Sequence, residues 1–498
     1  MNGVSHGTLL EGFRGLTNAT VALHERGMPR SPHARKPKTG GLRRMIALVT
    51  AAAVMSASLP VAAQDQGKSS KSRLVPVRDA EIEELLRDYT APIFKAAGVR
   101  AGATEIVLIR DFSFNAFVAN GQRIFVNVGA LLQSETPNQL IGVLAHETGH
   151  IAGGHLASTR QRMAEAQTRA IIAMLLGMAA VAGAGAAGAG NVGAGATGAM
   201  LAPQAVAKRD MLSYVRALEQ AADQAAVSYL AKSGQSAKGM IDTFRRFADQ
   251  SMFSARYSDP YAQSHPMPRD RIANLEALAK KSPSYNKADP DILRYRHAMA
   301  QAKTIGFLKD AGSIARAYPS RDTSMPARYA RAISAYRFGP VDPAIQQIDQ
   351  LIRQEPGNPY FWELKGQAYL EGGRPREAVA PLQKAVALAP ERPAALIRIM
   401  LAQALVATGS YKGAIAEINR AMAYERDVPA AYRVLAMAYG RTGDNARADV
   451  ASAQATFREG DIRLAKQLAA RAKTRLPTGS PSWLQADDIV SYKPPQMD

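Results

Sequence analysis

The chain has 498 residues, no cysteine and a formal net charge of +20 at pH 7. This length allows two or three domains with a sizeable core, and the lack of cysteine excludes disulfides, Cys-ligated zinc and thiol nucleophiles. The basic excess could suit nucleic acid or an anionic membrane, but aromatic residues make up only 6% of the chain and it has no nucleic-acid motif. We therefore expect no nucleic-acid partner and interpret the excess as general surface charge.

The first 63 residues have the pattern of a secretory signal peptide. Leu42-Arg43-Arg44 is a basic start, residues 45–55 are apolar, and Val61-Ala62-Ala63 supplies small residues at the −3 and −1 positions, which predicts cleavage after this segment. An uncleaved membrane anchor is the alternative, but the apolar stretch is short for a span. Residues 1–40 fit no mature structure and suggest a start codon assigned too early. No cysteine follows the apolar stretch, so the sequence does not predict a lipid anchor.

After a polar linker over residues 64–75, the pattern predicts a helix followed by three strands. Apolar residues recur with helical spacing over residues 81–97, and residues 105–109 have the composition of a strand. Residues 115–118 and 123–128 flank Ala119-Asn120-Gly121-Gln122, which predicts a hairpin.

The sequence His146-Glu147-Thr148-Gly149-His150 nearly specifies a reaction. The preceding run of residues 139–145 is apolar and lacks proline, which predicts a buried helix. Residues four apart lie on one helix face, so the two imidazoles can hold Zn²⁺ and leave positions for a third ligand and a water. Glu147 follows the first ligand and can act as a general base on that water.

A second helix over residues 213–230 offers the missing carboxylate. Glu219 and Asp223 are four apart and share one face, and the alanines around them indicate a helix that is buried against another. Glu219 would complete a His₂Glu set. Asp223 would accept the free ring N–H of a ligating histidine, which fixes the tautomer of that ring.

Residues 171–206 separate the two predicted ligand helices and have an unusual composition. Alanine and glycine alternate over residues 183–198, and glycine weakens a helix. We expect a mobile or membrane-touching flap beside the zinc cleft. A transmembrane span is the alternative, although it needs roughly 20 continuous apolar residues.

From about residue 320 the chain is repetitive. Four glycines, each followed five residues later by an alanine, recur at the 34- to 36-residue spacing of tetratricopeptide helix pairs: Gly339, Gly373, Gly409 and Gly443, with Ala344, Ala378, Ala414 and Ala448. Gly460 and Ala465 suggest one further pair or a cap. We expect connecting helices over residues 301–320, repeats over residues 321–478 with a concave protein-binding groove, and a tail over residues 479–498.

Several of these motifs together resemble a known family. The zinc helix, Asn115-Ala116-Phe117 and Glu219-Gln220-Ala221-Ala222-Asp223 resemble the HtpX and CAAX-prenyl-protease superfamily of gluzincins. Ser264-His265-Pro266, followed by Arg271-Ile272, is similar to the soluble periplasmic branch, and the zinc domain, His-Pro segment and repeats occur in the same order. One departure from the pattern of the family is the Ala/Gly tract within residues 171–206.

The resemblance implies several expectations about site and partners. One zinc per chain would be held by His146, His150 and Glu219, in the periplasm of a Gram-negative bacterium. The strand before the zinc helix, Ile124-Phe125-Val126-Asn127, would dock an extended substrate backbone by strand addition. The expected partners are unfolded or misassembled outer-membrane proteins, the β-barrel assembly machinery reached through the repeat groove, and a peripheral membrane contact through residues 171–206.

Two functions fit these observations. The first is a zinc endopeptidase in which His265 stabilises the oxyanion or occupies the fourth zinc position and keeps the enzyme latent, with Arg271 as the alternative oxyanion donor. The second is a chaperone or assembly scaffold with a structural or vestigial zinc site. Glu147 favours the enzyme, because a structural site needs no base beside its first ligand. His155 would lie about 140° around a continuous helix from His150, so we expect it to be structural or to support a ligand. The predicted fold is α+β and mostly helical, with a metalloprotease domain and small sheet over residues 76–300 and an all-α repeat solenoid.

Overall fold

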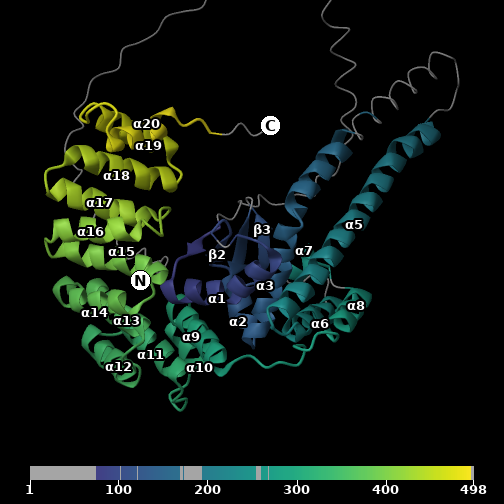
Figure 1. The fold of residues 1–498 in the computed structure, drawn as a ribbon, viewed down its shortest axis with the longest axis horizontal. Helices are drawn as coiled ribbons and strands as arrows, with labels where there is room; N and C mark the ends of the chain where they lie inside the picture. The colour runs from purple at the N-terminus through teal and green to yellow at the C-terminus, as the bar shows by residue number, and fades with distance from the viewer. Residues whose placement is uncertain are drawn as a thin grey trace, which may run out of the picture. The chain divides into compact units, whose positions relative to one another are not determined.

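The computed structural model describes residues 74–100, 102–119, 122–168, 172, 193–253, 260–266 and 268–494, with backbone alone for residues 193–208 and 251–253. The predicted signal peptide, most of the linker and much of the Ala/Gly tract lie outside the described residues. From Pro76 onwards the described residues belong to one unit. They form a small sheet surrounded by helices and then a long series of helices (Figure 1), so the predicted α+β, mostly helical fold is confirmed.

The sheet has four strands in the order β1-β2-β4-β3. These are β1 (Pro76–Val77), β2 (Glu105–Ile109), β3 (Ala116–Ala119) and β4 (Arg123–Asn127). β4 pairs in parallel with β2 and antiparallel with β3. The predicted strand and hairpin are thus confirmed, and the helix predicted before them is α1 (Ala80–Ala97).

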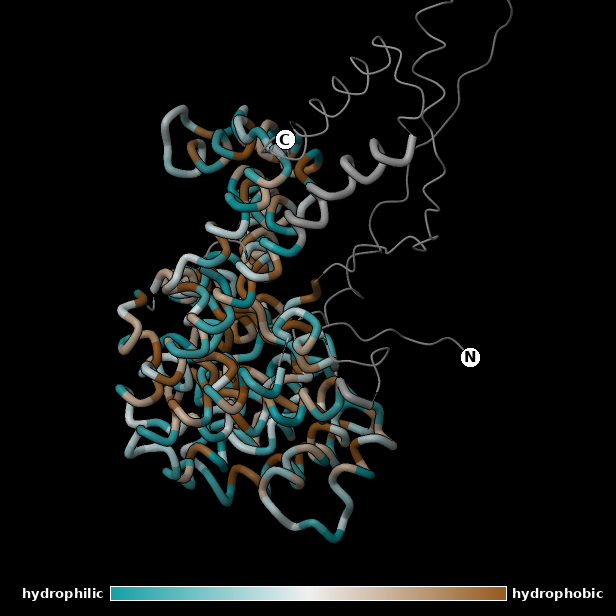
Figure 2. The backbone as a smooth tube through the Cα atoms, turned by 90° about the vertical axis from the view of Figure 1, so that its right-hand side faces the viewer, coloured by the Kyte–Doolittle hydropathy of each residue, from teal (hydrophilic) through white to brown (hydrophobic). Residues whose placement is uncertain are grey.

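The helices of this first domain pack around α3 (Pro137–Ala152). They are α2 (Val128–Gln133), α5 (Gly193–Lys232), α6 (Lys238–Phe253), α7 (Pro260–Ser264) and α8 (Arg269–Ala279). α3 contacts α1, α5 and α6 as well as β3 and β4, and nearly all of its residues are buried. Figure 2 shows hydrophobic and hydrophilic positions interleaved along the helices, as expected where a helix buries one face.

Two boundaries differ from the sequence-based expectation. α5 begins at Gly193, inside the Ala/Gly tract, because alanine has the highest helix propensity and extends the helix that carries the two acids. α9 (Asp291–Leu308) crosses the predicted domain boundary at residue 300. The His297 ring of α9 bonds Tyr89 Oη and the Ser134 carbonyl oxygen, each at 2.9 Å. Because Tyr89 and Ser134 belong to the first domain, these contacts tie α9 to that domain.

The repeats form antiparallel helix pairs after α10 (Ala311–Ala317). The helices are α11 (Met325–Phe338), α12 (Val341–Gln354), α13 (Pro359–Glu371), α14 (Pro375–Leu388), α15 (Glu391–Ala407), α16 (Tyr411–Ala421), α17 (Pro429–Arg441), α18 (Asn445–Arg458), α19 (Ile462–Lys473) and α20 (Pro481–Ser491). Gly373, Gly409 and Gly443 follow the first helices of their pairs with φ of +75°, +84° and +84°, where glycine is favoured. The predicted period is confirmed. The predicted tail is wrong for residues 481–491, because α20 packs on α18 and α19 and buries Ala486 and Ile489.

A buried charge cluster joins the first domain to the repeats. Lys303 Nζ on α9 lies 2.9 Å from Asp79 Oδ2, 3.3 Å from Glu81 Oε2 and 3.4 Å from Glu363 Oε2. Asp79 caps α1 and Glu81 lies in its first turn, whereas Glu363 belongs to α13. Such groups are costly to bury unless they are paired, so the cluster links α1, α9 and α13 in one arrangement.

A membrane-spanning helix must be both long and apolar. None of the helices in the part of the chain that the structure describes meets both conditions. The membrane-touching role expected for residues 171–206 falls largely outside that part.

Candidate metal centre

α3 presents the first two candidate ligands and the candidate base from a buried helix. His146, Glu147 and Thr148 are almost fully inaccessible to solvent, while the His150 side chain keeps 13% of its surface exposed. Pro137 starts the helix, where its missing N–H is not needed. The helix ends at Ala152, before Gly153 and the left-handed Gly154 with φ of +62°.

Two glycines of α3, seven residues apart, let neighbouring helices approach the site closely. A Cβ on Gly149 would lie 2.7 Å from the Ala222 carbonyl oxygen of α5, and one on Gly142 would lie 2.4 Å from Met240 Cβ of α6. Real Cβ atoms do not approach other atoms this closely. The glycine inside the motif therefore allows α5 to bring Glu219 and Asp223 within reach of the histidines.

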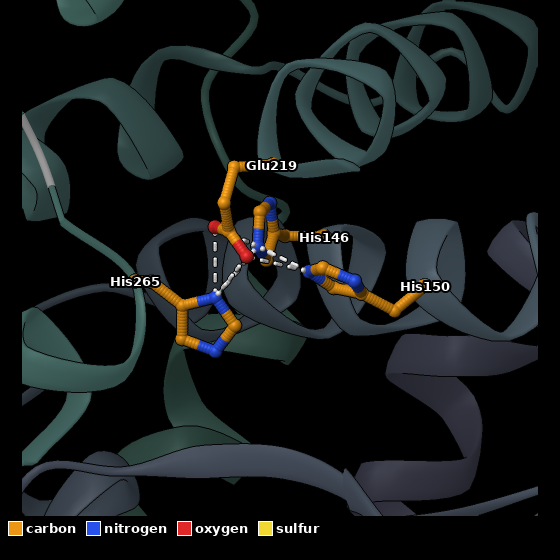
Figure 3. A group of neighbouring side chains, drawn as sticks. All are labelled: His146, His150, Glu219 and His265. Carbon is orange, nitrogen blue, oxygen red and sulfur yellow. Dashed lines mark hydrogen bonds and ion pairs between the residues drawn. The ribbon is translucent and has the colours of Figure 1, made fainter. Parts of the chain in front are cut away.

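Four side chains converge on one point between α3, α5 and the segment after α7 (Figure 3). His146 Nε2 lies 3.0 Å from His150 Nε2, 3.4 Å from Glu219 Oε2 and 3.3 Å from His265 Nδ1. Glu219 Oε1 lies 3.4 Å from His150 Nε2, and Glu219 Oε2 lies 2.9 Å from His265 Nδ1.

The spacing of the donor atoms matches that of a tetrahedral metal site. Zinc with bonds of about 2.0–2.1 Å places its ligand atoms about 3.3–3.4 Å apart. When each contact takes the nearer Glu219 oxygen, five of the six residue pairs bring their donor atoms to 2.9–3.4 Å, and one donor atom of each residue lies within 4.8 Å of the other three. Nitrogen and carboxylate oxygen donors in this arrangement fit zinc without further movement of the backbone.

Electrostatics at the cluster follow from burial and from the neighbouring ligands. Burial alone would raise the pKa of Glu219, but hydrogen bonds from His146, His150 and His265 outweigh it and hold that pKa far below its usual range. Burial lowers the pKa of His265, although the hydrogen bond with Glu219 opposes this shift. Glu219 is therefore an anion, and burial favours the neutral form of the His265 ring; these are the forms that bind metal.

Glu147 lies beside the cluster on the same helix and remains outside the ligand set. Burial raises its pKa to about 7, against the charges of His146 and His150. The backbone of Val118 on β3 partly opposes this rise in the pKa, and Glu147 Oε1 lies 3.6 Å from His265 Nε2. A carboxylate held near neutral pKa can accept and return a proton.

Asp223 and Arg271 form a layer of contacts behind the ligands. His146 Nδ1 lies 2.9 Å from Asp223 Oδ1, as expected from the sequence. Burial would raise the pKa of Asp223, but hydrogen bonds from Arg271 and His146 outweigh it and hold that pKa below its usual range.

The expectation that Arg271 could donate to an oxyanion does not fit its contacts. Its Nε and Nη2 donate to Asp223 at 2.6 and 2.9 Å, Nη2 lies 3.1 Å from Glu219 Oε2, and Nη1 donates to the Pro266 carbonyl oxygen at 2.7 Å. All three nitrogens are engaged behind the ligands. Arg271 thus fixes Asp223, Glu219 and the loop of His265, and it is a positioning residue.

The expected role of Ile124, Phe125, Val126 and Asn127 in strand addition also needs correction. These residues belong to β4, which is paired on both sides by β2 and β3. Its backbone groups are therefore not free to bind a further strand. β3 ends the described sheet beside α3, so the free edge next to Glu147 belongs to residues 116–119.

Two aromatic residues of the site were missed by sequence reasoning. Tyr261 is fully buried, and its ring centroid lies 4.7 Å from that of His265. Phe244 on α6 meets the His146 ring edge-to-face at 5.8 Å, and the Arg271 guanidinium lies 5.6 Å from its centroid. Tyr261 precedes His265 by four residues, a spacing that could have indicated contact, whereas Phe244 only continues the apolar period of α6.

His146, His150 and Glu219 converge on one point, and Glu147 lies beside them without belonging to the ligand set. This arrangement is that of a metalloprotease site. Comparison with known families agrees, because residues 76–279 match peptidase family M48 and residues 329–393 and 369–438 match tetratricopeptide repeats. The chain therefore carries a peptidase family M48 metalloprotease domain followed by tetratricopeptide repeats.

Similar proteins carry names that refer to β-barrel assembly. The chain is 27% identical over 258 residues to a putative beta-barrel assembly-enhancing protease of Vibrio cholerae serotype O1, an alignment that spans 51% of each chain. It is 25% identical over 384 residues to the beta-barrel assembly-enhancing protease of Yersinia pestis, with 75% of each chain covered. Among solved structures, that of MamA is 24% identical with a TM-score of 0.26, covering 32% of this chain and 89% of that chain.

Proposed function

We propose that this chain is a zinc-dependent endopeptidase of the periplasm that acts on outer-membrane β-barrel proteins during assembly or quality control. The observation that carries the chemistry is the convergence of His146, His150 and Glu219 with Glu147 beside them. The names of the similar proteins support the substrate class. The pattern of a signal peptide in the first 63 residues supports the location.

Zinc is the metal that the donor set favours. Two imidazoles and a carboxylate suit zinc, whereas a site for calcium or magnesium would be built from oxygen atoms. Asp223 Oδ1 lies 2.9 Å from His146 Nδ1, a contact that favours a proton on Nδ1 and leaves Nε2 for the metal. This contact behind the ligand is typical of zinc sites.

The residues of the site divide the chemistry of peptide hydrolysis among themselves. Bound zinc supplies a Lewis acid that polarises the scissile carbonyl and acidifies the attacking water. Glu147 accepts the proton from that water and passes it to the leaving amine, a role that its pKa of about 7 suits. Asp223 and Arg271 keep the ligands in place during these steps.

An extended substrate is best accommodated on β3. Strand addition requires a sheet edge with free backbone groups, and β3 ends the described sheet. β3 contacts α3, the helix that carries Glu147, so a strand added at β3 would lie close to the helix of the proposed base. This arrangement favours unfolded chains over folded ones, because a folded protein offers few free strands.

His265 is proposed as a fourth ligand that keeps the enzyme latent. Its Nδ1 lies 3.3 Å from His146 Nε2 and 2.9 Å from Glu219 Oε2, which are ligand-to-ligand distances. Binding at this position would exclude the attacking water. A client that displaces the segment around Pro266 would open the position.

The repeats are proposed to hold the protein partners, namely unfolded or misassembled β-barrel proteins and the machinery that assembles them. A cavity of about 400 Å³ lies among α16, α17, α18 and the start of α20. Aromatic and aliphatic side chains line it together with polar groups, including Tyr432, Tyr439, Arg447 and Gln485. Stacked repeats of this kind offer extended surfaces that bind polypeptide segments. A peripheral membrane contact through residues 171–206 remains an expectation.

The decisive experiment compares Glu147→Gln with Glu135→Gln, the same change at an exposed position just before α3. Wild type and Glu135→Gln should cleave casein or an unfolded β-barrel protein at the same rate, which is low while His265 holds the fourth position. Glu147→Gln should keep zinc and client binding but lose at least about 10²-fold in rate. Undiminished cleavage by Glu147→Gln rejects the mechanism. If wild type and His265→Ala both bind the barrel protein without cleaving it, the scaffold function is favoured instead.

A further inference from the structure

His155 returns to the metal centre because α3 stops short of it. The helix ends at Ala152, and the left-handed Gly154, with φ of +62°, redirects the chain. His155 Nδ1 then lies 3.0 Å from His150 Nδ1, with the two rings 5.0 Å apart and nearly perpendicular. The expected position about 140° away assumed a continuous helix and was wrong for this reason.

We infer that His155 is a positioning residue whose Nδ1 accepts a hydrogen bond from the Nδ1–H of His150 and thereby aims His150 Nε2 at the metal. The inference rests on the proposed function, since it requires His150 to bind metal through Nε2. That atom faces His146 and Glu219 at 3.0 and 3.4 Å, so the ring proton of His150 belongs on Nδ1. His155 must then present the lone pair of its own Nδ1 and carry its proton on Nε2.

The two histidine ligands are therefore supported in the same way by different groups. Asp223 Oδ1 lies 2.9 Å from His146 Nδ1, and His155 provides the corresponding acceptor for His150. An imidazole adds no negative charge, which matters in a site that already contains Glu219, Asp223 and Glu147. His150 has the most exposed side chain of the four ligand candidates, so its ring depends most on a contact that restricts its rotation.

The backbone before His155 is shaped to accept its ring. A Cβ on Gly153 would lie 2.2 Å from His155 Nε2 and 2.6 Å from its Cδ2, so the imidazole occupies the space that any other residue at 153 would fill. Ser158 Oγ donates to the His155 carbonyl oxygen at 3.1 Å. Gly153, Gly154 and His155 together form a short turn that holds one ring against a ligand.

The alternative is that His155 only fills the corner, and two substitutions separate these roles. His155→Asn keeps an acceptor close to the position of Nδ1, whereas His155→Phe keeps the ring and loses the acceptor. We expect His155→Phe to weaken zinc binding about 10- to 100-fold, the usual effect of losing such a partner. His155→Asn should restore affinity to within a few-fold of wild type. A role in packing alone predicts the reverse order.

The measurement is zinc affinity and release by competition with a chelator, supplemented by the visible spectrum of the cobalt-substituted protein. Thermal unfolding of the metal-free variants shows whether each retains its fold. Gly153→Ala, which displaces the His155 ring, should weaken zinc binding as His155→Phe does. Zinc retained equally by His155→Phe, His155→Asn and wild type overturns the inference alone. A wild type that binds no zinc overturns the proposed function together with it.

Discussion

Gly149 of α3 lies directly against the backbone of Ala222, where a Cβ would come within 2.7 Å of the carbonyl oxygen. Ala222 precedes Asp223 and follows Glu219 by three residues, so the contact sets the distance between the histidines and both acids. The glycine within the His-Glu-Thr-Gly-His sequence therefore acts through helix packing. It determines whether α5 can complete the metal centre.

Replacement of Gly149 by alanine should separate α3 from α5 and weaken zinc binding. Gly142→Ala is the matched control, because it makes the same change two turns earlier against Met240 of α6, a helix without ligands. Both variants should lower the melting temperature, since crowding a packed interface costs about 1–3 kcal/mol. Only Gly149→Ala should lower zinc affinity in chelator competition. Equal zinc affinities of the two variants would show that the contact with Ala222 does not set the site.

Loss of any one of His146, His150 or Glu219 should abolish stoichiometric zinc binding. A site that keeps only two of these three ligands, with His265 as its one further donor, competes poorly with solvent or chelator. Elemental analysis should give about one zinc per wild-type chain and far less for each alanine variant. His297→Ala is the control for losing a buried histidine, because His297 bonds Tyr89 and Ser134 away from the site. Full zinc content in Glu219→Ala would require another carboxylate as ligand.

His265→Ala should raise peptidase activity if His265 occupies the fourth position. The gain arises because removal of the ring frees the site for water, and X-ray absorption should then show a nitrogen ligand replaced by oxygen. A fall in activity of about 10²-fold or more would instead assign His265 to the oxyanion. An unchanged rate with unchanged coordination would contradict both roles.

The cluster at the domain junction should make stability depend on pH through Glu363. Burial, reinforced by Asp79 and Glu81, raises the pKa of Glu363 to about 7 although Lys303 opposes this. The folded-state pKa exceeds the unfolded value, so the stability that Glu363 contributes is complete below about pH 4.5 and is lost as the pH rises through about 7.

Glu363→Gln should remove this dependence, because glutamine resembles the protonated acid. Its melting temperature should match that of wild type near pH 5 and exceed it near pH 8, by an amount that corresponds to about 1–3 kcal/mol. Glu391→Gln, an exposed change in the same repeats, should follow wild type at both values. Parallel melting curves for wild type and Glu363→Gln would contradict the expected linkage.

The sequence by itself determined the parts of this protein that depend on local periodicity. His146 and His150, like Glu219 and Asp223, are four residues apart, and helical geometry alone puts each pair on one face. The repeat glycines likewise predicted where the first helices end, because a left-handed residue after a helix favours glycine. These features could be read without knowing which helices meet.

Tertiary structure decided every role that depends on contacts between distant segments. Strand order made β4 internal and left β3 as the edge, which the hairpin pattern could not reveal because it fixes only adjacent pairing. Arg271 turned toward Asp223 and Glu219 because buried carboxylates require a cation. The turn at Gly154 brought His155 to His150, since a single left-handed residue redirects the chain that follows. Local spacing fixes directions within an element, while packing and charge pairing between elements decide which side chains meet.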